Sequence, residues 1–296
     1  MNKKYVLKKD SVHGYLRADP IPTPEEVERY YKEEFYANHK AFFNDSSLEV
    51  QLEEKDFYDG RRKGVLEVLK GHFGFFKGLT LFDIGFGFAQ ELLFFRDHGF
   101  FVTGVEPSAQ GFEYAKARGL DVRQGAIEGF SFSGENRFDV VNANSILEHL
   151  RDPAALLQNI REKLLKPEGV LILTLPNDFN DFQVIADKEF ELDQWWFCPP
   201  THINYFSCSS IKSLLNNCGY DVFHAESSFP LELFLLMGDV YVGNPDLGKI
   251  CHRKRVQFEA LMRKHGKASE LSKLYQSLAE LNLGRELTLF AVPKEK

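Results

Sequence analysis

The sequence lacks any long apolar run, and this absence narrows the class of protein. No stretch of about 18 apolar residues, the length that a membrane-crossing helix needs, occurs in its 296 residues. The first residues, MNKKYVLKKDSVHGYLRADP, carry charge but no apolar core of signal-peptide length. We therefore expect a cytoplasmic protein with no membrane partner.

Cysteine is also scarce. The four cysteines, Cys198, Cys208, Cys218 and Cys251, form no C-x-x-C pair and are too few for a disulfide framework in a chain of this length. The spacing of Cys198, His202 and Cys208 lacks the tight ligand pairs of a structural zinc site. We expect reduced thiols and no bound metal.

Positive charge is not in excess, because 36 Lys and Arg face 43 Asp and Glu, for a net charge of −7. Nucleic-acid affinity rests mainly on neutralised phosphates, so we expect no nucleic-acid partner. Phenylalanine, in contrast, is abundant at 28 residues, which predicts an aromatic-rich core and an aromatic pocket. The composition leaves a homodimer open as the assembly.

Helical and strand patterns alternate from about residue 57 onward. Strands separated by helices favour right-handed crossovers and a parallel sheet covered on both faces. The predicted strands are 79–84, 101–105, 122–124, 138–142, 170–175 and 221–225, and the predicted helices are 61–70, 89–98, 108–118, 153–165 and 209–217.

The segments around this core set the expected domain organisation. Residues 1–57 hold a proline-rich stretch and a helical pattern beginning at Pro24, and we interpret them as an N-terminal helical cap. Residues 58–296 form the main domain, with a largely helical insertion at about 230–284 before the closing strand RELTLFAVP. Residues 177–208 read as a long aromatic loop, and loops of that length are usually functional.

A glycine turn follows the first predicted strand of the core, in LFDIGFGFAQE (residues 81–91). Gly85 and Gly87 let the backbone turn tightly and approach a ligand, and the helix that follows directs its N–H groups to the same place. Glu106 ends the next strand, 21 positions after Gly85, where a carboxylate can accept hydrogen bonds from ribose hydroxyls.

The same stretch departs from a dinucleotide site. Gln90 stands where the third glycine of G-x-G-x-x-G allows helix and strand to pack around a pyrophosphate. Asp83, just before the turn, is a second departure, because a buried carboxylate there would suit an ammonium group better than a diphosphate. S-adenosylmethionine has an amino acid end, a ribose and an adenine but no phosphate, and we predict it as the cofactor. An NAD(P)-dependent oxidoreductase and a non-catalytic cofactor-binding protein of the same fold remain the alternatives.

Several further motifs carry a family resemblance. LFDIGFGFAQE, VTGVEPS, FDVVNANSILEHLRDPAALLQNIREKLLKPEGVLILTLPN and GYDVFHAES resemble the successive motifs of the class I S-adenosylmethionine-dependent methyltransferases, over about residues 60–229 and again in LGRELTLFAVP. The resemblance implies a Rossmann-like α/β fold, with a seven-stranded, mostly parallel sheet whose last strand is antiparallel. The cofactor-binding residues that it implies are Asp83, Gly85, Gly87, Glu106, Pro107, Gly125, Ala126, Ile127 and Asn144.

One position departs from the family pattern. Many relatives carry an acidic residue where this sequence has Ala126, so the hydrogen bond to the adenine amine must come from elsewhere. The layout otherwise resembles bacterial methyltransferases that act on sugars and other small metabolites. No cysteine precedes Cys198, so we expect no N-terminal zinc module of the kind found in sugar C-methyltransferases, which argues against sugar C-methylation. We expect a small-molecule acceptor, with a sugar or nucleotide-linked sugar as one candidate.

Methyl transfer is an in-line displacement that depends on positioning, together with a base for the accepting group. Histidine suits this role because its pKa lies near operating pH. His202, in PPTHINYFS, is the favoured general base, and His149, after the fourth strand, is assigned a positioning or shared role. For both histidines a purely structural role is the alternative. Trp195, Trp196 and Tyr205 are the expected substrate-binding residues, and Tyr205 is an alternative base.

The helical segment at 249–267 is locally basic. A basic run on a helix is most often a solvated face, and that is the interpretation we favour. The alternative is a lid that attracts an anionic acceptor.

Overall fold

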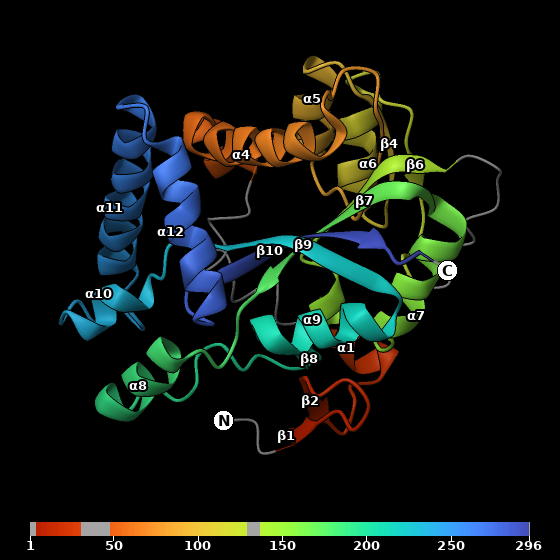
Figure 1. Ribbon diagram of the computed structural model, residues 1–296. Helices are drawn as coiled ribbons and strands as arrows, with labels where there is room; N and C mark the ends of the chain where they lie inside the picture. Colours follow the sequence, from red (N-terminus) through yellow and green to blue (C-terminus); the bar gives the residue numbers. More distant parts are fainter. Residues whose placement is uncertain (1–3, 31–47, 129–136, 296) are drawn as a thin grey trace. The chain divides into compact units, whose positions relative to one another are not determined.

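The computed structural model describes residues 4–30, 48–128 and 137–295. The chain divides into two compact units, each assembled from separate segments. Unit 1 comprises Met1–Gly60, Pro176–Ile211 and Glu226–Leu287, and unit 2 comprises Arg61–Leu175, Lys212–Ala225 and Thr288–Lys296. Figure 1 shows the ribbon with its elements labelled.

A seven-stranded sheet with the order β5-β4-β3-β6-β7-β10-β9 organises the core (Figure 1). Neighbours from β5 to β7 pair in parallel. Asn177 pairs with Arg285 and Thr174 with Thr288, so β10 runs antiparallel to β7, and the predicted fold class is confirmed. The strands are β3 (Thr80–Ile84), β4 (Phe101–Glu106), β5 (Arg123–Gln124), β6 (Phe138–Asn144), β7 (Leu165–Pro176), β9 (Tyr220–Ser227) and β10 (Glu286–Pro293).

The strand order reverses direction at β3. The chain runs outward from β3 to β4 and β5, then returns to place β6 on the other side of β3. Such a reversal opens a crevice at the carboxyl ends of the strands, where open α/β sheets bind ligands. The middle of the sheet is apolar and excludes water, with Leu81, Val140 and Leu171 each 0% exposed. The ends of β3, β4 and β6 are therefore the part of unit 2 that can carry chemistry.

Helices cover both faces of this sheet (Figure 1). The helix α7 (Pro153–Asn159) shows why the prediction succeeded locally: the Asp152 carboxylate accepts the Ala155 N–H at 3.0 Å, and Pro153 opens the first turn. The predicted helix 153–165 ends in a π-helical turn, Ile160–Leu164. On one face lie α4 (Lys55–Phe73), α5 (Gln90–Asp97) and α6 (Ala109–Lys116), and on the other α7 (Pro153–Asn159) and α9 (Cys208–Asn217).

The N-terminal segment is not wholly helical, and that part of the predicted cap was wrong. Strands β1 (Val6–Lys9) and β2 (Leu16–Asp19) form an antiparallel pair, and β2 also pairs with β8 (Asn204–Tyr205). The helices α1 (Pro24–Tyr30) and α3 (Leu48–Glu53) agree with the prediction, while residues 31–47 of the cap lie outside the described residues.

Local turn chemistry explains this hairpin. The Asp10 carboxylate accepts the N–H groups of Val12 and His13, and Gly14 takes the left-handed conformation with φ +82°. An aspartate followed closely by a glycine is a turn signal that the sequence analysis did not use.

The predicted long loop at 177–208 was wrong over residues 181–190, which form helix α8 (Asp181–Phe190). The Asn180 side chain caps this helix by accepting the Gln183 N–H at 3.1 Å. Asn180 was a readable N-cap signal in the sequence. The helix after it is only ten residues long and lies among prolines and aromatic residues, so its periodicity did not stand out.

The residues of the predicted helical insertion form the helices α10 (Glu232–Leu236), α11 (Pro245–Lys264) and α12 (Ala268–Glu280). Figure 1 shows α11 and α12 side by side, and a small core of Leu231, Phe234 and Cys251 lies under α10 and α11. In the part of the chain that the structure describes, no helix is long and apolar enough to cross a membrane.

Two leucines of α12 give a matched test of this packing. Leu271 is 3% exposed and Leu274 is 43% exposed. Leu271→Ala should lower the free energy of unfolding by about 2–5 kcal/mol, because the truncation leaves a cavity. Leu274→Ala removes the same atoms from the surface and should cost less than about 1 kcal/mol. Urea denaturation of both variants measures the difference, and equal losses would contradict the packing of α12.

Candidate functional site

The glycine turn after β3 has a backbone that only glycine accommodates at Gly85. Its φ is +71°, and a Cβ there would stand 2.4 Å from the Ile146 Cδ1 and 3.2 Å from the Ile127 Cδ1. The Gly85 N–H donates to the Val105 carbonyl at 2.8 Å. At Gly87, no atom of the described residues lies within 4 Å of the corresponding Cβ position, so a ligand can approach there.

The Glu106 carboxylate is locked against this turn. Its Oε2 accepts the Gly87 N–H at 2.8 Å, its Oε1 accepts the Ser108 N–H at 2.8 Å, and the residue is 6% exposed. Each oxygen retains a lone pair for a ligand hydroxyl. Gly111, which was not predicted as a site residue, allows α6 to pack directly on the glycine turn. A Cβ at this position would lie 2.4 Å from the Gly87 carbonyl oxygen and would push the helix away.

Asp83 is a buried carboxylate with one oxygen unused. Its Oδ1 accepts the Asn142 Nδ2–H at 2.8 Å, while its Oδ2 has no hydrogen-bond partner among the described residues. Burial raises the pKa of Asp83 well above its usual range, the Asn142 hydrogen bond opposes the shift, and the charges of Glu91 and Glu106 add to it. A donor or a positive charge beside Oδ2 would relieve this cost.

Asn142 was not predicted as a site residue. It lies in β6 in register with Asp83 and is 7% exposed. The signal was available in the sequence, because an amide in the otherwise apolar strand FDVVNAN needs a partner once buried.

The other predicted cofactor residues lie at strand ends of unit 2. The Gly125 N–H donates to the Glu106 carbonyl at 3.2 Å, directly after β5. Pro107, Ala126 and Asn144 are exposed, and Asn144 is the last residue of β6. Their contacts with a cofactor stay predictions.

Gln90 uses the third-glycine position differently from a dinucleotide site. Its Nε2 donates to the Phe88 carbonyl at 3.1 Å and to the Tyr114 hydroxyl at 3.3 Å. The start of α5 is thereby tied to α6 through a side chain, whereas a glycine there would allow the close helix–strand approach of pyrophosphate sites.

The two predicted catalytic histidines belong to different units. His149 is in unit 2, in the 3₁₀ turn Leu147–His149, with its Nε2 3.9 Å from the Glu148 Oε1. His202 is in unit 1, where its backbone N–H donates to the Cys198 carbonyl at 3.3 Å. Both side chains are half-buried, and a carboxylate beside His149 can orient its ring. Their catalytic roles stay predictions.

Tyr205 is a structural tie within unit 1. Its hydroxyl accepts the Cys198 N–H at 3.2 Å and donates to the His202 carbonyl at 2.9 Å. The residue is 2% exposed, and burial raises its pKa far above the usual range. The hydroxyl is therefore poorly suited to the alternative role of general base.

The two tryptophans differ in environment. Trp195 is half-buried, and its ring lies edge-on to Trp196 at 4.6 Å between centroids. Trp196 is 7% exposed and meets the Phe179 ring at 5.4 Å. Phe179 has φ +59°, a left-handed conformation that costs energy for a bulky residue and is frequent at functional sites.

A set of polar residues that the sequence analysis missed lies in unit 1. We call Asp178, Gln183, Glu232, Tyr241 and Arg285 the polar cluster. Glu232 is 0% exposed, with its Oε1 3.4 Å from the Arg285 Nη1. Burial raises the pKa of Asp178 to about 7; Arg285 opposes the shift, Glu232 adds to it, and the Gln183 side chain opposes it.

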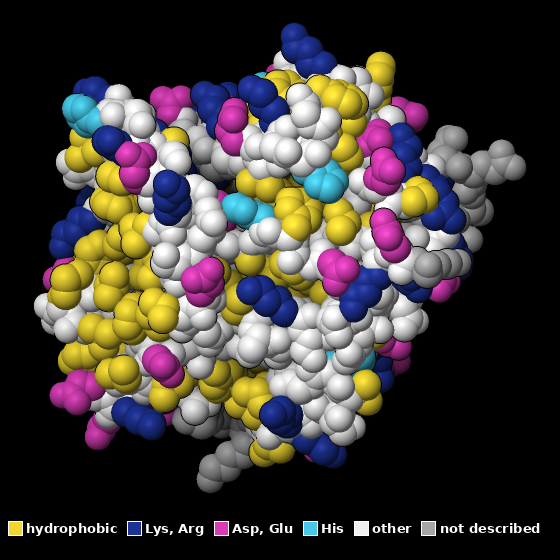
Figure 2. Space-filling model, in the orientation of Figure 1, with side chains coloured by type: hydrophobic (Ala, Val, Ile, Leu, Met, Phe, Trp, Pro, Cys, Tyr) yellow, Lys and Arg dark blue, Asp and Glu magenta, His cyan; other side chains and the backbone are white. Residues whose placement is uncertain are grey.

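Part of the basic charge of segment 249–267 is paired with acidic side chains within unit 1. Lys254 pairs with Asp239 at 2.8 Å, and Arg263 pairs with Glu259 at 2.9 Å. Arg255 is 5% exposed and stacks over the Phe57 ring at 5.2 Å. Figure 2 shows hydrophobic side chains gathered over α10 and α11 on the visible face. These contacts favour a structural helix face over an anion-attracting lid.

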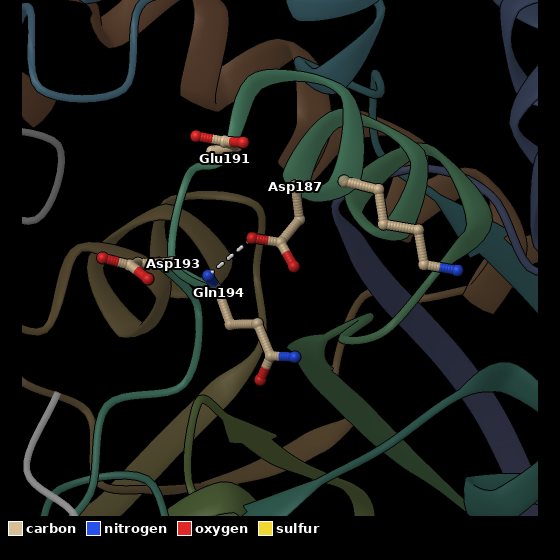
Figure 3. Close-up of a pocket in the computed structure, with 5 residues that line it drawn as sticks. Asp187, Glu191, Asp193 and Gln194 are labelled. Atoms are coloured by element: carbon tan, nitrogen blue, oxygen red, sulfur yellow. Dashed lines mark hydrogen bonds between the residues drawn. The ribbon is translucent and has the colours of Figure 1, made fainter.

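An open hollow of about 340 Å³ lies beside α8 (Figure 3). It is lined by Asp187, Lys188, Glu191, Asp193 and Gln194, and the Gln194 N–H donates to the Asp187 Oδ1 at 2.8 Å. It contains none of the predicted site residues, and its acidic groups are half-buried or exposed to water.

Comparisons with known proteins place these features in a family context. Residues 61–225 match the family described as "Methyltransferase domain". A "Ubiquinone biosynthesis O-methyltransferase" of Caulobacter vibrioides is 32% identical over 133 residues, 43% of this chain and 52% of the relative. A protein of the same name from Cereibacter sphaeroides is 30% identical over 154 residues, 49% of this chain and 62% of the relative. The chain spans about half the length of the curated relatives that it matches.

Among solved structures, magnesium protoporphyrin IX methyltransferase from Synechocystis PCC 6803, crystallised with bound SAH, aligns with a TM-score of 0.49 and 16% identity. The alignment covers 67% of this chain and 90% of that structure.

The raised pKa of Asp178 predicts a pH-dependent stability. The unfolded chain loses this proton near pH 4, whereas the folded chain keeps it to about pH 7. The folded state therefore binds more protons in this window, and the group's contribution to the free energy of unfolding falls as pH rises from about 4 to about 7. Asp178→Asn removes the titration, so the variant should gain stability over wild type, on the order of a few kcal/mol by pH 8.

Urea denaturation of the full chain at pH 4.5, 6 and 8 measures this difference. Asp181→Asn, at an exposed aspartate of the same segment, is the matched control and should run parallel to wild type across the series. A constant difference between Asp178→Asn and wild type at all three pH values would contradict the raised pKa.

Proposed function

The chain belongs to the methyltransferase-domain family, with residues 61–225 forming its class I S-adenosylmethionine-dependent domain, and from this premise we propose that the whole protein methylates a small-molecule acceptor. An NAD(P)-dependent oxidoreductase and a non-catalytic cofactor-binding protein, the two alternatives drawn from the sequence, have less support. The family is one of methyltransferase domains, and Gln90 replaces the third glycine of a dinucleotide site.

The pair of carboxylates at the ends of β3 and β4 is the observation that carries the proposal. The unused Oδ2 of Asp83 accepts from the ammonium group of the methionine end of S-adenosylmethionine, whose positive charge offsets the cost of the buried carboxylate. The remaining lone pairs of Glu106 accept from the ribose hydroxyls. Gly85 and Gly87 give the backbone room beside the ligand, as the open space at Gly87 supports.

The adenine contacts follow from the segment after β5. Gly125, Ala126 and Ile127 lie beside the adenine, with Ile127 supplying an apolar contact and the backbone replacing the acidic side chain that Ala126 lacks. Pro107 and Asn144 complete the cofactor set.

We assign the acceptor to unit 1 and the accepting atom to an oxygen. The curated relatives are named as O-methyltransferases, which favours a hydroxyl over an amine or a carbon. The finer proposal is a sugar or nucleotide-linked sugar. Trp195 and Trp196, with Tyr205 as the wall behind them, provide an aromatic surface of the kind that packs on a sugar ring.

Methyl transfer to a hydroxyl requires two things from the protein, a base for the hydroxyl proton and alignment of the two reactants. When bound, S-adenosylmethionine supplies a methyl group on a sulfonium. His202 would take the proton of the acceptor hydroxyl as its oxygen bonds the methyl carbon and the carbon–sulfur bond breaks, which leaves S-adenosylhomocysteine. His149, held beside Glu148, would have a positioning or shared role. Alignment of the two reactants supplies most of the rate enhancement.

The cofactor assignment is tested at Glu106. Glu106→Ala should weaken S-adenosylmethionine binding by at least about 1.5–3 kcal/mol, roughly 10- to 150-fold, because a charge-assisted hydrogen bond is lost. Isothermal titration calorimetry measures the change. Glu113→Ala, at an exposed position of α6, is the matched control and should bind like wild type. Unchanged affinity in Glu106→Ala would remove Glu106 from the cofactor site.

The base assignment is tested at the histidines. His202→Gln and His149→Gln should each lower turnover roughly 10²–10⁴-fold while leaving cofactor affinity nearly intact. The wild-type rate should fall as pH drops below the pKa of the base, because the protonated imidazole cannot accept a proton.

The exposed His265 supplies a matched control, and His265→Gln should keep wild-type turnover. Near-normal rates in both His202→Gln and His149→Gln would show that neither histidine is the base.

A further inference from the structure

Unit 1 contains several buried polar atoms whose hydrogen bonds are missing. The Asp178 Oδ2, Gln183 Oε1, Glu232 Oε2 and Tyr241 hydroxyl are buried, and none has a partner among the residues that the structure describes. Each such atom costs about 1–3 kcal/mol, and folded proteins leave few of them. A ligand that bonds these four atoms would remove that cost.

These atoms share one locality around Arg285. Its Nη1 lies 3.4 Å from the Glu232 Oε1. The charges of Glu232 and Arg285 both act on the ionisation of Asp178 and on that of Tyr241. The polar cluster is therefore one electrostatically connected group. It is built from the segment after β7, helix α8, helix α10 with the segment that follows it, and the residue before β10.

An asparagine clamp fixes the cluster in place. The Asn177 N–H donates to the Arg285 carbonyl at 2.9 Å, and its Nδ2 donates to the Gly284 carbonyl at 3.0 Å. Asn180 bonds the Asn177 carbonyl at 2.9 Å through Nδ2 and caps Gln183 through Oδ1. Both asparagines are 0% exposed. A rigid support of this kind holds side chains in the geometry that a ligand site needs.

An aromatic wall adjoins Asp178. Phe179 has φ +59° and packs edge-on to Trp196 at 5.4 Å. The Trp196 Nε1 is itself a buried donor with no partner within the described ranges. Backbone strain next to unsatisfied polar groups is a feature of ligand sites, where the surrounding structure holds the strained residue.

The chemistry of the unused atoms selects the ligand class. The set includes carboxylate and amide oxygens that accept, an indole N–H that donates and a phenol that does both. Hydroxyl groups can satisfy all of these, since each donates and accepts. A phosphate would face the carboxylates of Asp178 and Glu232, and an ammonium group has no atom that can accept from Trp196.

We propose that the polar cluster and Trp196 form the binding site for an uncharged polyhydroxylated ring, the sugar ring of the acceptor. Asp178, Gln183 and Glu232 accept from ring hydroxyls, and Trp196 and Tyr241 donate to them. The aromatic edge at Phe179 and Trp196 contacts the apolar face of the ring. The role of this ring as methyl acceptor rests on the proposed function, but its binding in unit 1 does not.

Saturation-transfer NMR with the full chain tests the site. The probes are methyl α-D-glucoside, methyl α-D-galactoside, methyl α-D-mannoside, N-acetylglucosamine and UDP-glucose, with ethanolamine as the ammonium probe. At least one sugar should bind, and Asp178→Asn and Glu232→Gln should each weaken it at least tenfold. Asp187→Asn is the matched control and should leave binding unchanged. Asp187 lines the open hollow and lies on helix α8, which also carries Gln183.

Two further readouts separate the outcomes. Calorimetry with S-adenosylmethionine should give wild-type affinity in Asp178→Asn, and denaturation confirms that the variant is folded. A carboxylate with only a structural role would change stability and leave sugar binding intact, which would overturn the proposal. So would binding of no sugar by wild type, or ethanolamine binding that Asp178→Asn removes. If calorimetry detects no binding of S-adenosylmethionine by wild type, the proposed function is instead refuted.

Discussion

The two hydrogen bonds that Glu106 accepts hold the cofactor side of this protein together. They join the end of β4 to the glycine turn after β3 and to the start of α6, so one buried carboxylate fixes three pieces of backbone. The arrangement requires Gly111, because any side chain there would collide with the Gly87 carbonyl. A ligand at this edge meets a turn that is already set, and little ordering cost is left for binding.

The buried carboxylates differ in how many of their oxygens have hydrogen-bond partners among the described residues. Both oxygens of Glu106 have backbone partners, whereas Asp83, Asp178 and Glu232 each keep one oxygen with no partner among the described residues. Unsatisfied buried charge is costly, and native structures keep it where function requires it. One such oxygen lies in unit 2 at the expected methionine end, and two lie in the polar cluster of unit 1.

Local patterns carried the prediction where local physics decides the structure. The strands of the sheet, helix α7 and the glycine turn were predicted because apolar runs, an Asp-Pro cap and paired glycines act over a few residues. The same reasoning missed the β1–β2 hairpin and helix α8, although Asp10 with Gly14 and Asn180 were readable signals. Of the candidate cofactor site, Gly85, Gly87, Glu106 and Asp83 were proposed from the sequence, while Asn142 and Gly111 emerged from strand register and helix packing.

The sequence by itself determined the family, the parallel sheet and the strand ends that carry the glycine turn, since each depends on contiguous motifs. Only the tertiary structure decided which polar groups lose water. Asp178, Glu232 and Arg285 lie in separate segments, and none of them is exceptional in its local sequence. Their hydrogen-bonding demand arises when packing removes solvent from all of them at once, and burial is a property of the folded chain as a whole.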